Sequence, residues 1–108
     1  MPDLAAEDAK LVTLARATRA RTRAAQGAAV RDTDGRTYAA ASVDLPSLQL
    51  SAIQVCIAMA HSSGSTGLEA VVLMTAAGPD ADPGEVVADA DRAAIADFAG
   101  PDVPLHLR

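Results

Sequence analysis

The chain has 108 residues, half of them apolar, which is enough for one domain with a packed core and excludes general disorder. The formal net charge of −5 at pH 7 argues against nucleic acid as a partner of the chain as a whole. Tyr38 and Phe98 are the only aromatic residues and 26 residues are alanine, so we expect a thin core with closely spaced backbones.

The distribution of charge and apolar residues along the chain indicates what kind of partner and which compartment to expect. Residues 1–36 carry seven basic and five acidic side chains, whereas residues 37–108 carry two basic and nine acidic ones. This asymmetry favours head-to-tail contacts between copies or one local basic patch. The N-terminus lacks the order of a signal peptide, and no apolar run approaches the ~20 residues of a membrane span, so we expect a cytoplasmic protein. One lysine among nine basic residues, with abundant alanine, indicates a GC-rich bacterial gene.

The first part of the chain predicts a helix followed by a β-hairpin. Asp3 is a suitable N-cap, and apolar residues recur at helical spacing over residues 4–20. Residues 26–31 and 36–43 have the composition of two strands, and the Asp34-Gly35 pair supplies the positive φ angle of the turn between them.

The rest of the chain predicts, in order, a loop, a helix, a strand, a helix and a short strand, at residues 44–47, 48–63, 68–75, 83–99 and 103–107. Ser47 is the expected cap of the first of these helices, and Pro83 begins the second. The first helix is apolar nearly all round, so it needs cover on more than one side. The order α-β-β-α-β-α-β, with no repeat or linker, predicts a single α/β domain over residues 1–108 with helices on both faces of a mixed sheet of about four strands.

Several short strings resemble the cytidine deaminase family. The string Gly27-Ala-Ala-Val, followed by Asp34-Gly-Arg-Thr-Tyr38, is similar to the G-A-A-hydrophobic…D-G-x-x-Y hairpin of that family. Counting on without gaps, Ala41-Ser-Val-Asp44 falls on its C-N-hydrophobic-E substrate loop, and Ile53-Gln-Val55 falls on its C-A-E string. Asp91-Arg-Ala93 falls on C-R-Q, the end of P-C-x-x-C-R-Q. The resemblance implies a three-layer α-β-α cytidine deaminase-like fold and an oligomeric assembly.

The same resemblance implies that the metal site is lost. Zinc deaminases hold the metal through three His or Cys ligands, and a glutamate carries protons while the metal activates water. The three ligand positions are Ile53, Ala88 and Asp91, and the glutamate position is Val55. Apolar side chains neither coordinate zinc nor carry a proton, and one carboxylate is not a site. We therefore expect no catalytic residue, no metal and no cofactor.

A direct count of possible ligands leads to the same expectation. Cys56, His61 and His106 are the only cysteine and histidine residues, and a single cysteine also excludes an intrachain disulfide. Cys56 and His61 are five positions apart on one expected helix, about 140° apart around its axis, so they cannot bind one ion together. A buried, inert Cys56 and a His61 at the helix C-terminus are the simpler interpretations.

Two other groups are candidate binding residues. Ser42 and Asp44, at the substrate Asn and Glu positions of the family, can form a small polar pocket, although loop capping explains them as well. Arg16, Arg19 and Arg23 follow i, i+3, i+7 spacing on one helix face, which fits RNA phosphates, an acidic protein surface or plain solvation. An acidic run, Asp80, Asp82, Glu85 and Asp89, lacks the calcium-loop order and fits a solvated loop and helix start.

We expect a catalytically inactive cytidine deaminase-like protein, a pseudoenzyme, that acts as a homo-oligomeric interaction or regulatory module. A dimer or tetramer, or a different protein partner, would cover the apolar central helix. Two alternatives stay open: an active zinc-dependent cytidine deaminase, hence a hydrolase, with a non-standard site, and a metal-free nucleotide- or RNA-binding module.

Overall fold

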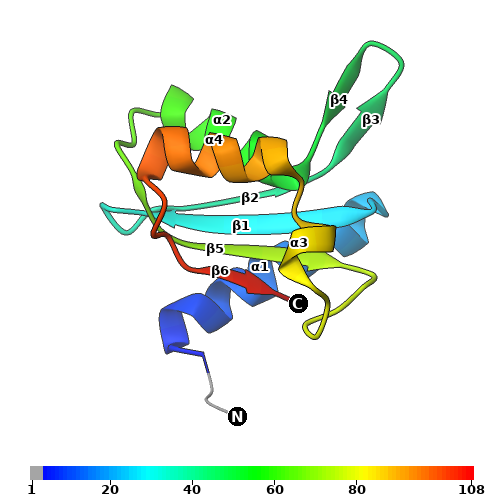
Figure 1. Cartoon of the computed structure of the whole chain (residues 1–108), viewed down its shortest axis with the longest axis horizontal. Coiled ribbons are helices and arrows are strands. Elements are labelled where there is room, and N and C mark those ends of the chain that lie inside the picture. Colours follow the sequence, from blue (N-terminus) through cyan, green and yellow to red (C-terminus); the bar gives the residue numbers. More distant parts are fainter. Residues whose placement is uncertain (1–3) are drawn as a thin grey trace.

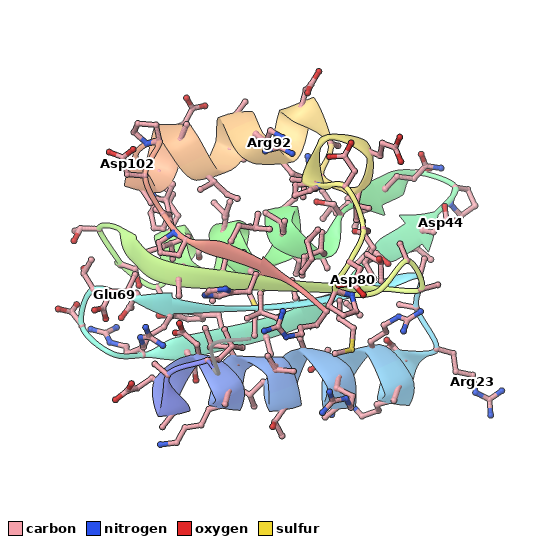
Figure 2. The ribbon with its side chains drawn as sticks, turned by 60° about the horizontal axis from the view of Figure 1, so that its bottom comes forward. Arg23, Asp44, Glu69, Asp80, Arg92 and Asp102 are labelled. Atoms are coloured by element: carbon pink, nitrogen blue, oxygen red, sulfur yellow. The ribbon has the colours of Figure 1, made fainter. Side chains whose placement is uncertain are left out.

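A four-stranded mixed sheet with helices on both faces organises the chain, as Figures 1 and 2 show. The structure is a computed structural model and describes residues 4–108. Its elements are α1 (Ala6–Thr22), β1 (Gln26–Asp32), β2 (Thr37–Ala41), β3 (Val43–Leu45), β4 (Leu48–Leu50), α2 (Ala52–Ser62), β5 (Leu68–Thr75), α3 (Pro83–Val86), α4 (Asp89–Ala99) and β6 (Leu105–Leu107). The strand order is β2-β1-β5-β6; β1 pairs antiparallel with β2 and β5, and β5 pairs parallel with β6. The expected fold class is confirmed.

Helix α1 alone covers one face of the sheet. Its buried residues Leu11, Val12 and Ala15 pack against the small side chains of β1 and β5. The helix begins at Ala6, and Ala5 before it makes no side-chain cap; the expected cap, Asp3, lies outside the described residues. No helix of residues 4–108 is long and apolar enough to cross a membrane.

Helices α2 and α4 cover the other face, where the larger core lies. Ile53 and Cys56 of α2, which packs on β1 and β2, are fully buried, and Ile95 of α4 joins the same cluster. The predicted last helix is in fact two, α3 and α4. Val87 interrupts it in extended conformation, and its side chain is 1% exposed within the core. Burial of this valine therefore outweighs continuation of the helix.

The segment between β2 and α2 is a second hairpin rather than the expected loop and early helix turn. Strands β3 and β4 pair Val43 with Leu50 and Leu45 with Leu48. Ser51, not Ser47, caps α2: its hydroxyl accepts from the Gln54 backbone N–H, and the Gln54 side chain accepts from the Ser51 N–H. Helix α2 therefore starts at Ala52, four residues after the expected start at residue 48.

Buried Asp32 organises the turn of the β1–β2 hairpin. Its Oδ1 atom accepts from the backbone N–H groups of Asp34 and Arg36, both at 2.9 Å, and its Oδ2 accepts from the Ser65 hydroxyl. Gly35 has the expected positive φ of 86°. Burial raises the pKa of the Asp32 carboxyl, but the bonds from Ser65 and the two N–H groups outweigh burial, so its pKa lies below the ordinary value.

Replacing Asp32 tests this arrangement through pH. Because the folded pKa is depressed, the carboxylate stabilises the fold above its unfolded pKa of about 3.9, and the contribution is lost as pH falls through the folded value. We expect Asp32→Asn to flatten the fall in unfolding free energy below about pH 4, measured by urea titration. Asp34→Asn removes the same charge from an exposed side chain in the same turn; an identical flattening there would contradict the assignment.

Gly27 is where α1 approaches the sheet most closely. A Cβ atom at this position would overlap the carbonyl oxygen of Ala15 and lie 2.7 Å from the Cβ of Arg19. We expect Gly27→Ala to lower the unfolding free energy by about 1–3 kcal/mol, measured by chemical denaturation. The control is Gly67→Ala, whose Cβ would meet Thr33 at an ordinary 3.5 Å. Equal losses in the two variants would show that the close approach is unimportant.

Candidate functional site

The catalytic positions of the expected family site lie at the N-termini of α2 and α4. Ile53 is fully buried in the first turn of α2, and Val55 is half-buried against the same core. Ala88 is the exposed N-cap position of α4 and makes no side-chain cap. Asp91, in the first turn of α4, is 2% exposed. These positions therefore lie in the first turns, or at the N-cap, of two different helices.

A hydrogen bond between side chains joins these two helix starts. The Ser51 hydroxyl donates to Oδ1 of Asp91 at 2.7 Å, across 40 positions of sequence. The same hydroxyl accepts from the Gln54 N–H at 3.0 Å, so Ser51 caps α2 and holds α4 with one oxygen atom. We call the pair Ser51 and Asp91 the helix clasp.

Gln26 and Ser42 extend this polar network onto the sheet. The Gln26 side-chain oxygen accepts from the Ala52 N–H at the start of α2, at 3.2 Å. The Gln26 backbone N–H donates to the Ser42 hydroxyl at 3.1 Å. Hydrogen bonds from three elements thus meet at the N-terminus of α2. The Ser51–Gln54 capping pattern is visible in the sequence, but nothing local in it indicates that Gln26 or Asp91 takes part.

The residues at these positions do not fit a zinc ion. A structural or catalytic zinc needs at least three His, Cys or carboxylate donors directed at one point. No group of three such residues occurs within residues 4–108. Ile53 has no donor atom, and Asp91 is bonded to Ser51. Between these two helix starts, the side-chain link that the structure shows is the hydrogen bond from Ser51 to Asp91.

The remaining cysteine and histidines lie in three separate surroundings. Cys56 is fully buried, its thiol donates to the Tyr38 carbonyl at 3.7 Å, and burial raises its pKa to about 12, so it is a neutral thiol. His61 lies exposed in the last turn of α2, with its ring edge-on to Phe98 at 5.7 Å. His106 on β6 contacts Asp8 of α1, Nε2 to Oδ2 at 3.2 Å. None of them is placed to act on a common substrate.

The remaining predicted binding residues lie on three different parts of the surface: the β3–β4 hairpin, the end of α1 and the segment that leads into α4. Asp44 lies on the exposed β3–β4 hairpin, and Figure 2 shows it far from the centre of the sheet. The hydroxyl of Ser42 is used by β1, and the Ser42–Asp44 pocket stays a prediction. Arg16, Arg19 and Arg23 surround a hollow beside the end of β5. The acidic run 80–89 is exposed, and Asp82 in it caps α3 by accepting from the Gly84 N–H at 2.9 Å.

Comparisons with known proteins agree with the geometry. A sequence model of the family described as cytidine deaminase-like matches residues 4–108. The cytidine deaminase of Mycobacterium leprae has 23% identity and a TM-score of 0.75, over 95% of this chain and 87% of that one. The cytidine deaminase of Burkholderia pseudomallei has 20% identity and a TM-score of 0.75, over 90% and 80% respectively. No curated protein matches. At these identities the two solved structures establish the shared fold.

The clasp is testable through Asp91. Truncation by Asp91→Ala leaves the Ser51 hydroxyl without its buried acceptor and should lower the unfolding free energy by about 1–3 kcal/mol in chemical denaturation. Asp89→Ala is the matched control, because Asp89 lies in the same first turn of α4 but is exposed. Both variants lose the interaction of a carboxylate with the helix dipole, so only the clasp distinguishes them. Equal losses would contradict its role.

Proposed function

Because the chain belongs to the cytidine deaminase-like family, we propose that it is a catalytically inactive member acting as a homo-oligomeric interaction or regulatory module. The observation that carries the proposal is the state of the two helix starts. The resemblance assigns the family's metal centre to these positions, and here they carry Ile53, Val55, Ala88 and a carboxylate that is hydrogen-bonded to Ser51.

Hydrolytic deamination sets requirements that these residues do not meet. The reaction needs a water molecule activated by a metal and a side chain that moves protons to and from the base. Val55 has no ionisable group, and Asp91 is almost fully buried. The one thiol is neutral at physiological pH. In a chain that lacks these catalytic groups, the fold serves to present a surface that binds other molecules.

The surface that supports self-association is the β3–β4 hairpin. Paired strand residues lie on the same face, so Val43, Leu45, Leu48 and Leu50 form one apolar face while Asp44 and Gln49 form the other. Leu45 is 54% exposed and Leu48 is 48% exposed. Figure 1 shows the hairpin standing away from the sheet and the helices. An isolated two-stranded hairpin is marginal in water, so this apolar face fits burial against a second copy.

A shallow groove on the outer side of α2 and α4 supports the same proposal. Ile57, Ala58, Ala94 and Phe98 line it, and its volume is about 390 Å³. The groove accounts for the helix that is apolar nearly all round: one side of α2 packs on the sheet, one on α4, and the remaining side faces this groove.

Metal content and turnover test the inactive state. Protein purified without chelators should contain far less than one zinc per chain and should not convert cytidine to uridine, assayed by elemental analysis and by absorbance. Stoichiometric zinc together with cytidine turnover would overturn the proposal and establish an active deaminase with a different site.

Sedimentation tests the association. At tens of micromolar we expect the mass of a dimer or tetramer. A Leu45→Asp/Leu48→Asp variant should shift toward the monomer by at least tenfold in dissociation constant, since burial of a leucine contributes about 1.5–3 kcal/mol. Gln49→Asp adds a charge to the polar face of the same hairpin and should keep the wild-type mass. A wild-type monomer would refute the homo-oligomer.

A further inference from the structure

Three arginines line a hollow between the C-terminal half of α1 and the end of β5. The hollow has a volume of about 360 Å³ and is formed by Arg16, Arg19, Ala20, Arg23, Ala24 and Met74. Within residues 4–108 none of these three guanidinium groups has a carboxylate at ion-pair distance. Arg31 and Arg36, by contrast, are paired with Asp8 and Asp34. The three arginines thus leave a concentration of positive charge unneutralised.

The position of Arg19 is set by the fold. Its Nε–H donates to the Ala25 carbonyl at 3.2 Å, which fixes the guanidinium beside the α1–β1 connection and leaves its two terminal amino groups for another partner. The absence of a side chain at Gly27 lets the Arg19 Cβ approach β1 closely. Arg23 follows the helix with a φ of 54° and extends away from its end, as Figure 2 shows.

Neutralising the helix dipole does not account for this charge. The C-terminus of a helix corresponds to about half a negative charge, which one basic side chain satisfies. Arg21, also in the last turn of α1, is exposed and does not line the hollow. Arg16, Arg19 and Arg23 therefore exceed what the end of the helix requires.

We propose that this hollow binds a small ligand through a diphosphate group. Guanidinium groups bind phosphate oxygens in bidentate geometry, and three of them match the roughly three negative charges of a diphosphate ester at neutral pH. Arg16 and Arg19 lie about one turn apart on one face of α1, so their side chains can converge on one phosphoryl group, while Arg23, beyond the end of the helix, turns toward the second when the ligand binds. Ala20, Ala24 and Met74 supply an apolar floor for the remainder of the ligand.

The surroundings favour a small ligand over a nucleic acid. Stacking of bases needs aromatic side chains, and Tyr38 and Phe98 both pack on the opposite face of the sheet. The net charge of −5 opposes a long polyanion, while the hollow lies in the volume range of small-molecule sites.

Titration with inorganic diphosphate at low ionic strength tests the site. We expect saturable binding of one diphosphate per chain by calorimetry, tighter than for inorganic phosphate, with NMR shifts confined to residues 16–24 and the end of β5. Arg16→Gln/Arg19→Gln should weaken binding at least tenfold. Arg21→Gln removes one positive charge from the same helix outside the hollow, and it should stay within twofold of the wild type, whereas Arg19→Gln, with the same loss of charge, should weaken binding.

Several outcomes would overturn the proposal: no saturation at millimolar diphosphate, or an equal weakening by Arg21→Gln. Tighter binding of an RNA oligonucleotide, with a salt dependence that reflects many phosphates, would assign the arginines to RNA instead. Another outcome is self-association of the chain that weakens with salt and that Arg16→Gln/Arg19→Gln abolishes. It would show that the arginines bind the acidic run 80–89 of a second copy instead.

Discussion

The hydrogen bond from Ser51 to Asp91 is the contact on which the arrangement of the second helical layer depends. Helix α4 is reached through a short helix and a buried valine, and it packs against α2 while its Ile95 joins the core. Its first turn carries a nearly buried carboxylate, which is costly unless a donor meets it. Ser51 supplies that donor. Its hydroxyl oxygen therefore caps the N-terminus of α2 and also binds the first turn of α4.

This contact lies where the resemblance places the metal ligands of the cytidine deaminase family. An ion between two helix starts links them through several strong bonds. Here the link consists of Ser51 and Asp91, with Gln26 tying the same helix start to β1. The apolar Ile53 then completes the core beneath it.

The fold was largely predictable because its signals are local. The turn at Gly35, the strand of residues 68–75 and the order of the main-sheet strands and their covering helices follow from short patterns and match the structure. The errors have two causes. Long-range burial decides at Val87, which divides the last helix to reach the core. At the β3–β4 hairpin, the expected strand to residue 43, loop 44–47 and helix from residue 48 overlook the local pairing of Val43 with Leu50 and of Leu45 with Leu48. The clasp was not predictable, since its partners are 40 residues apart and neither has a motif.

The β3–β4 hairpin has a consequence for how the chain responds to concentration. It contains three residue pairs and rests little of its apolar face on the body of the domain. Opening of the hairpin in a monomer therefore costs less free energy than unfolding of the domain, and it leaves the main sheet intact. Under the proposed self-association through this hairpin, amide hydrogen exchange of residues 43–50 slows as the protein concentration rises. The exchange rate of the hairpin then reports the fraction of associated chains.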